Sequence, residues 1–291
     1  MQRTLDYIVK EKEDGLAVKS LLSSSLSLSR RQISRLKISH GITLNGREAV
    51  LTEPVRSGDR LRLTFMAQDY GTADILNRKP DILYEDSILI IVNKPYGIPS
   101  HADREHPDRH MGTVLQRYYG EDFTVRTVGR LDKDVSGIMV YAKNAETAAK
   151  LAESRKSRVF RKTYAAAAEG IFESKKDTLV YHLEKDGRRK RSRISETGRE
   201  CITSYEVLKE YNGISLLSVS IETGRLHQIR AGMAYAGHPL CGDRLYGGSR
   251  DLIGRPALHC SDISFVHPGT GKTIKVSCPL PDDMKRLFDE L

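Results

Sequence analysis

The chain has 291 residues, which is enough for one large domain or two unequal ones. Its hydrophobic fraction of 39% and charged fraction of 29% are those of a globular protein and exclude a disordered or fibrous one. Lysine and arginine total 47 against 38 acidic residues, and the resulting net charge of +9 favours an anionic partner such as nucleic acid.

The sequence also argues against membrane insertion and against a structural metal. It contains no run near the roughly 18 apolar residues that a membrane helix needs, and its start, MQRTLDYIVKEKEDG, lacks the apolar core of an export signal. No C-x-x-C pair occurs, which argues against zinc and for reduced thiols. We therefore expect a cytoplasmic protein without a metal. The four widely spaced cysteines are Cys201, Cys241, Cys260 and Cys278.

Residues 1–67 are predicted to form a small α/β domain of two helices and a small sheet. Leu21 and Leu22 indicate the first helix, and Ile33 and Leu36 share one face of the second, within SLSRRQISRLKISHG. The Asn-Gly pair in ITLNGREAV indicates a hairpin turn. In GDRLRLTF, apolar and polar residues alternate as in a half-buried strand.

The second of these helices carries a dense group of cations. They have no acidic neighbours at helical spacing, so their repulsion is uncompensated unless phosphates approach. A solvated helix face is the alternative, but we expect contact with RNA or DNA. The helix and the strand after it resemble the small RNA-binding domain named for ribosomal protein S-four, through SRRQ and I-x-L-N-G. The expected RNA-binding residues are Arg30, Arg31, Arg35 and Lys37.

A polar linker is predicted over residues 68–80, followed by a larger domain over 81–291. Strand-like runs dominate this domain, among them SILIIVNKP, GIMVYAK, KTYAAAAEG and GISLLSVSIETG. AETAAKLAESRKS is predicted to be a helix. Because strands and helices do not alternate regularly, we expect an α+β domain on a mixed, mostly antiparallel sheet. The basic stretch Lys185–Arg199 is predicted to be either an RNA-binding surface or a solvated loop.

Two short segments combine charges in a way that suggests a catalytic site. Asp132 in GRLDKDVSG would by itself be a turn former. The segment ETGRLHQIR, however, places Arg225, His227 and Arg230 between a strand and a helix, and buried arginines need acidic partners. We expect Arg230 to keep Asp132 ionised and oriented, as a nucleophile or a base requires.

These segments resemble the pseudouridine synthases of the RluA type, which carry H-R-L-D-x-x-T-S-G and a later T-G-R-x-H-Q-I-R. Further matches are IVNKPYGIPSH, RKTYAAAAEG, GHPLCGDRLYG and the region from RPALHC to FVHPGTGK, in the same order. The resemblance implies the pseudouridine synthase fold and extends from Leu83 to Pro281. Two positions depart from the family loop, because Gly129 replaces a histidine and Val135 a threonine.

The resemblance also implies roles for single residues. Asp132 would be the catalytic aspartate, Tyr164 the tyrosine that stacks on the target base, and Arg230 the partner of the aspartate. Arg130 would hold the RNA open around a flipped uridine, and Lys94 and Leu258 would line the pocket. Arg225 and His227 are expected to bind substrate. No metal ligands are expected.

The expected activity is isomerisation of specific uridines in structured RNA. Ribosomal RNA of the large subunit is the first expectation and transfer RNA the second, acted on by a monomer without a cofactor. The sequence does not distinguish attack by the carboxylate from proton abstraction. The main alternative is a non-catalytic RNA-binding or ribosome-assembly protein on the same fold. A hydrolase using Asp132 and Asp134 is less favoured, because the two side chains would point apart in an extended loop.

Overall fold

The computed structural model describes residues 3–26, 28, 33, 36–37, 40–65, 79–102, 109–120, 123–124, 126–157, 159–187 and 191–288. The chain divides into two compact units, Met1–Ile75 and Leu76–Leu291. The predicted linker over 68–80 lies almost entirely outside the described residues, so it stays a prediction.

The first unit is a four-stranded antiparallel sheet with order β1-β4-β2-β3, packed against helix α1. Buried leucines, isoleucines and valines from both form its core, and the buried Ile33 and Leu36 of the predicted second helix join them. The strand β1 was not anticipated. The elements are β1 (Arg3–Ile8), η1 (Glu11–Glu13), α1 (Val18–Ser24), β2 (Ile42–Leu44), β3 (Arg47–Glu48) and β4 (Arg60–Phe65).

Local sequence determines two features of this unit. Asn45 and Gly46 both have positive φ, 52° and 85°, as a tight hairpin between β2 and β3 requires. On β4, Leu61 and Leu63 are buried while Arg62 is exposed, as the alternation predicted. Of the expected RNA-binding residues only Lys37 is described, and it is exposed; Arg30, Arg31 and Arg35 lie outside the described residues.

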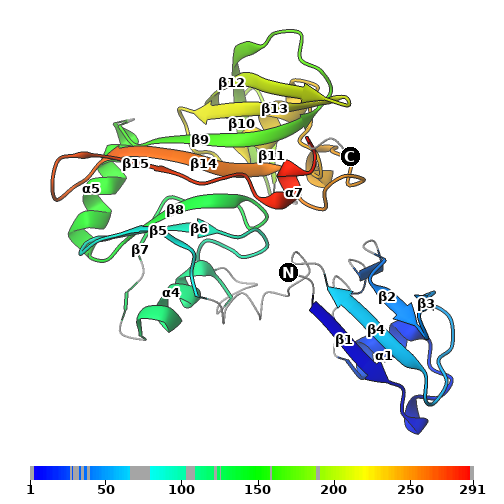
Figure 1. Ribbon diagram of the computed structural model, residues 1–291. Coiled ribbons are helices and arrows are strands. Elements are labelled where there is room, and N and C mark those ends of the chain that lie inside the picture. Colours follow the sequence, from blue (N-terminus) through cyan, green and yellow to red (C-terminus); the bar gives the residue numbers. More distant parts are fainter. Residues whose placement is uncertain are drawn as a thin grey trace. The chain divides into compact units, whose positions relative to one another are not determined.

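The second unit is built on an 11-stranded sheet with the order β11-β10-β12-β13-β9-β14-β8-β6-β5, to which β15 and β7 add at β14 and β8 (Figure 1). Among its described residues, every strand pair is antiparallel except β14 with β8. The prediction of a mixed, mostly antiparallel α+β fold is confirmed. No helix among the described residues is long and apolar enough to cross a membrane.

The strands of the second unit are β5 (Ile82–Glu85), β6 (Leu89–Lys94), β7 (Arg126–Val128), β8 (Ser136–Ala142), β9 (Arg161–Glu169), β10 (Lys176–Asp186), β11 (Arg191–Ile194), β12 (Arg199–Tyr211), β13 (Ile214–Ile221), β14 (Leu258–Val266) and β15 (Thr273–Ser277). Its helices are α4 (Met111–Tyr119), α5 (Ala145–Lys156), α6 (Gln228–Tyr235), η2 (Arg244–Tyr246) and α7 (Asp282–Lys285).

The loop between β7 and β8, residues 129–135, is held in place by the segment that follows β6. Ser100 accepts a hydrogen bond from the Leu131 amide at 3.0 Å and donates one to its carbonyl at 2.6 Å. The Gly97 amide donates to the Lys133 carbonyl at 2.8 Å. These contacts fix backbone atoms on both sides of residue 132.

Lys94 supports the same loop from inside the unit. Its side chain is fully buried, and its Nζ donates to the carbonyls of Pro95, Ile98 and Lys133 at 2.9, 3.0 and 3.2 Å. Burial lowers the pKa of Lys94 to about 7, although Asp134 acts in the opposite direction. Lys94 is therefore a buried donor that links the end of β6 to the loop.

Gly137, which follows the loop on β8, allows the close approach of β14. Its φ is +111°, and a Cβ at this position would lie 2.3 Å from the carbonyl oxygen and 2.5 Å from the amide nitrogen of Cys260. These are backbone atoms of the only parallel strand pair among the described residues, where Cys260 faces Gly137. No side chain fits without separating the two strands.

We predict that Gly137→Ala destabilises the second unit by about 3 kcal/mol or more, because the strain of a positive φ and the overpacking against Cys260 both lower the stability of the folded state. Gly213→Ala is the matched control, because Gly213 also has a positive φ, +75°, but a Cβ on it would have no neighbouring atom within 4 Å. It should cost about 1 to 2 kcal/mol. Urea denaturation followed by circular dichroism measures both, and equal effects would contradict the packing argument.

We also predict that the stability advantage of wild type over Lys94→Met rises with pH between about 7 and 10.5. In that interval the unfolded chain binds a proton at Lys94 that the folded chain has lost, so alkali favours folding. Below pH 7 both states hold the proton, and the difference should be constant. Urea denaturation of both proteins from pH 6 to 10 tests this, and a difference that is flat from pH 7 to 10 would contradict it.

Candidate active site

A cavity of about 910 Å³ lies in the second unit, beside the loop of residues 129–135. Its walls come from this loop, from α5 and β9, from β10 and β11, from the connection between β13 and α6, and from the start of β14. This volume is within the usual range for ligand pockets. Seven of the expected site residues line it: Arg130, Asp132, Tyr164, Arg225, His227, Arg230 and Leu258.

Asp132 extends from the loop into this cavity, with a quarter of its side chain exposed. Its Oδ2 lies 3.3 Å from Nη1 of Arg230, which donates a hydrogen bond to it. The same oxygen is 3.6 Å from Nε2 of His227. The structure thus places next to each other the two segments whose charges we expected to pair, and it leaves part of the carboxylate accessible from the cavity.

Arg230 has a stronger partner that sequence reasoning missed. Its Nε and Nη2 donate to Oδ2 and Oδ1 of Asp243 at 2.6 and 2.8 Å, which makes a bidentate ion pair. Asp243 is only 1% exposed. The guanidinium carbon of Arg230 lies over the ring of Tyr246, 5.2 Å from the ring centroid. Burial alone would lower the pKa of Arg230, but the hydrogen bonds and charge of Asp243 raise it above its ordinary value. Arg230 therefore stays charged, and its third nitrogen, Nη1, can donate a hydrogen bond to Asp132.

Asp243 was detectable as part of GHPLCGDRLYG, a segment that we matched to the family without assigning a role to its acid. It precedes the short helix η2, and the buried face of α6 brings Arg230 over it. The distance of 13 residues along the chain has no helical or strand periodicity. Only the packing of α6 against η2 makes the two residues partners.

His227 is tied to the β10–β11 hairpin through Tyr246. It precedes α6 with a left-handed backbone, φ +54°, and its Nδ1 is 3.0 Å from the hydroxyl of Tyr246. That hydroxyl accepts from the Ser192 amide at 2.9 Å and donates to the Ser192 carbonyl at 3.1 Å. Burial lowers the pKa of His227, while Asp132 acts against the shift. The imidazole is therefore mainly neutral near pH 7.

Tyr164 and Leu258 form an apolar wall of the cavity. Both are buried, on the neighbouring strands β9 and β14. Burial raises the pKa of Tyr164 well above its ordinary value, with further contributions from Cys260 and Asp132. Its hydroxyl has no hydrogen-bond partner among the described residues. The ring is thus a neutral phenol that offers one face and one free hydroxyl.

The remaining expected residues divide into two groups. Arg130 and Arg225 are exposed residues of the cavity wall, where an anion can reach them. Lys94 does not line the cavity; its place behind the loop corrects the expectation, because its three hydrogen bonds to carbonyls direct it away from the ligand space. Lys162 is an unanticipated cavity residue, and burial lowers its pKa.

The basic stretch over 185–199 is partly a strand hairpin. Its described residues include the end of β10, all of β11 and the first residue of β12, and Lys185, Ser192 and Arg199 line the cavity. No group of three or more histidine, cysteine, aspartate or glutamate side chains within the described ranges is arranged to hold a metal ion.

Comparison with known proteins agrees with this architecture. Residues 88–235 match the family model of RNA pseudouridylate synthase, and residues 5–61 match that of the RluD ribosomal pseudouridine synthase N-terminal domain. Among solved structures, human RNA pseudouridylate synthase domain containing 1 has a TM-score of 0.58 at 24% identity, covering 70% of this chain and 84% of that one. This likeness shows the fold.

Two bacterial relatives extend the match over most of the sequence. The uncharacterized RNA pseudouridine synthase YhcT of Bacillus subtilis is 34% identical over 98% of this chain and 96% of its own length. Ribosomal large subunit pseudouridine synthase D of Xylella fastidiosa is 32% identical over 90% of this chain and 85% of its own length. The chain therefore belongs to the RNA pseudouridylate synthase family, the isomerases that convert uridine in RNA to pseudouridine.

Proposed function

We propose that this protein isomerises one or more uridines of ribosomal RNA in the large subunit, with Asp132 as its catalytic carboxylate. The observation that carries the proposal is the partly exposed carboxylate of Asp132 in a cavity, held by an arginine that is itself fixed by a second, buried carboxylate. Such an arrangement keeps a carboxylate oriented and open to a ligand.

The assignment to ribosomal RNA rests on relatives. Several of them bear the name ribosomal large subunit pseudouridine synthase D, and the match of residues 5–61 is to a ribosomal pseudouridine synthase domain. Transfer RNA is the second candidate. We also infer a cytoplasmic location, because that is where bacterial ribosomal RNA is modified. The monomeric state stays a prediction.

The size and lining of the cavity support entry of a single flipped nucleotide. A uridine in a structured RNA is stacked, so extruding it costs a few kcal/mol, which stacking and hydrogen bonds in a pocket must offset. Tyr164 and Leu258 provide an apolar surface for the base. Arg130 and Arg225 provide cations for the surrounding phosphates.

The reaction itself breaks the bond between ribose C1′ and uracil N1 and forms one between C1′ and C5. The proton on C5 is lost and N1 gains one, so no redox agent is needed. The carboxylate of Asp132 either attacks the sugar or base, or takes a proton from the ribose while uracil leaves. In each route Arg230 stabilises the ionised carboxylate before and after the step, because its own position does not depend on the substrate.

The alternative is a non-catalytic RNA-binding protein on the same fold. A binder of phosphates gains nothing from a carboxylate in its pocket, since like charges repel. Two details favour catalysis. Asp132 is accessible from the cavity, and the arginine that faces it has a second carboxylate partner, so Asp132 is not required to neutralise a buried charge.

We predict that Asp132→Asn lowers the rate of tritium release from RNA labelled at uridine C5 by more than about a thousandfold. Total RNA from cells that lack the protein is the substrate. Asp134→Asn is the control for charge and loop position; Asp134 does not line the cavity, and the variant should keep activity within about tenfold of wild type.

Release by wild type and by Asp134→Asn, but not by Asp132→Asn, would support the proposal. Binding of RNA without release by wild type would favour the non-catalytic alternative. Equal release from wild type and Asp132→Asn would show that another residue is the catalytic carboxylate.

We predict that Arg230→Lys and Asp243→Asn each lower kcat by about 10- to 100-fold with little change in KM. Lysine lacks the planar fork that bridges the two carboxylates, and asparagine cannot match both donors of Arg230. Single-turnover tritium release measures the chemical step directly. Wild-type turnover by Arg230→Lys would contradict the proposed role of this pair.

Asp283→Asn is the matched control for Asp243→Asn. Asp283 accepts from Nε and Nη2 of Arg255 at 2.7 and 2.9 Å, so it forms a second buried, two-pronged pair, and it does not line the cavity. Both variants should lose about 3 to 5 kcal/mol of stability. Only Asp243→Asn should also lower kcat at a temperature where all three proteins are folded.

A further inference from the structure

The last turn of α5 contributes a cation to the cavity that neither the sequence motifs nor the proposed chemistry has used. Arg155 lines the cavity from this helix. A Cβ on Gly129 would lie 3.1 Å from the Cζ of Arg155 and 3.3 Å from its Nε and Nη1. A Cβ on Gly224 would lie 3.7 Å from its Nη2. The guanidinium therefore lies against two glycines, one on each of the loops that carry Asp132 and Arg225.

Gly129 is also one of the two positions where the loop departs from the family pattern. It has φ +81°, a conformation that favours glycine, and any side chain on it would press on the Arg155 guanidinium. The histidine that the family pattern has at this position would compete for the same space. Glycine at 129 and arginine at 155 thus fit together, and the cation occupies room that a side chain on the loop would fill.

The charge of Arg155 is not neutralised within the described protein. The two lysines on the same helix form ion pairs, Lys150 with Glu146 at 2.7 Å and Lys156 with Glu153 at 3.1 Å. Arg155 forms neither an ion pair nor a hydrogen bond with any described residue. Its charge acts on the cavity instead: it opposes the rise in the pKa of Tyr164 and contributes to the lowered pKa of Lys162.

Of the five arginines that line the cavity, Arg130, Arg155 and Arg225 come from three separate segments. Arg130 directly follows Gly129, and Arg225 directly follows Gly224, so both flank the backbone against which the Arg155 guanidinium lies. Like charges on neighbouring segments repel one another. A phosphate would remove the repulsion, and the planar fork of arginine matches phosphate oxygens two at a time.

We propose that Arg155 binds a backbone phosphate next to the uridine held in the cavity, and that it completes a phosphate site with Arg130 and Arg225. This inference rests on the proposed function, since it requires an RNA with a nucleotide extruded toward Asp132. Arg155 acts in substrate binding, and the chemical step remains with Asp132 and Arg230.

The experiment measures tritium release at limiting and at saturating RNA over a series of potassium chloride concentrations, again with total RNA labelled at uridine C5. Arg155→Ala should lower kcat/KM about tenfold near 0.15 M salt and leave kcat within about twofold. The slope of log kcat/KM against log salt should become shallower by about 0.7 to 0.9, which is the effect of one phosphate contact. Arg155→Lys should retain the wild-type slope.

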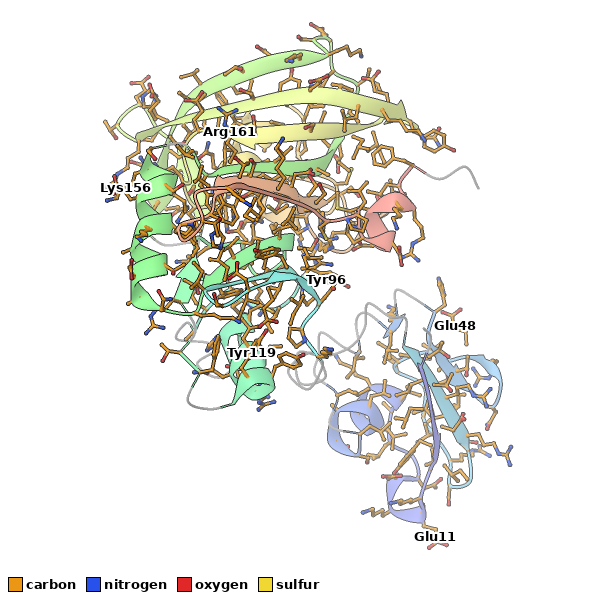
Figure 2. All side chains as sticks on the ribbon, turned by 60° about the vertical axis from the view of Figure 1, so that its left-hand side comes forward. Glu11, Glu48, Tyr96, Tyr119, Lys156 and Arg161 are labelled. Atoms are coloured by element: carbon orange, nitrogen blue, oxygen red, sulfur yellow. The ribbon has the colours of Figure 1, made fainter. Side chains whose placement is uncertain are left out.

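Lys156→Ala is the matched control, because it removes the same charge from the same helix end but from a residue outside the cavity. Figure 2 labels Lys156 where α5 ends and Arg161 where β9 begins, the two ends of the connection beyond Arg155. Lys156→Ala should leave both kcat/KM and the salt slope close to wild type.

Equal salt slopes for wild type, Arg155→Ala and Lys156→Ala would overturn the phosphate assignment. A fall in kcat for Arg155→Ala with an unchanged slope would overturn it too, and would mean that Arg155 positions the catalytic loop. Failure of the proposed function is separable from both, because wild type itself would then release no tritium at any salt concentration.

Discussion

The charge balance around Arg230 determines the organisation of the active site. A buried guanidinium is unfavourable without compensation, and Asp243 provides it through two short hydrogen bonds in a location closed to solvent. With this pair complete, the remaining nitrogen of Arg230 can interact with Asp132 without depending on it. The carboxylate of Asp132, the proposed catalytic group, thus remains partly exposed to the cavity.

The loop that carries Asp132 is fixed from the opposite side by a different set of interactions. Lys94 and Ser100 bind its backbone carbonyls and one of its amides, and Gly137 allows β14 to approach the strand that follows it. The segment IVNKPYGIPSH, whose Lys94 we expected to line the pocket, is therefore a support for the loop. Rigid support of this kind keeps a catalytic group near its working geometry before the substrate arrives.

The cavity combines two kinds of surface that an RNA substrate requires. Its apolar wall of Tyr164 and Leu258 suits a flipped base, while Arg130, Arg155 and Arg225 suit the phosphates around it. The β10–β11 hairpin belongs to the same site, since Ser192 binds Tyr246, which in turn contacts both His227 and Arg230. The hairpin is thereby connected to the residues around Asp132.

The sequence by itself determined the family, the mostly antiparallel fold and several of the residues that line the cavity, because motifs such as GRLDKDVSG and TGRLHQIR are local patterns. It also predicted the hairpin at Asn45-Gly46 and the helix over Ala145–Lys156, where turn chemistry and helix propensity act over a few residues. Only the tertiary structure decided the partner of Arg230, the buried place of Lys94 and the position of Arg155. Each of these depends on residues distant in the chain, brought together by the packing of α6 on η2, of β6 beside β8, and of α5 near the loop. Such contacts follow from how whole elements pack, and no local sequence pattern specifies them.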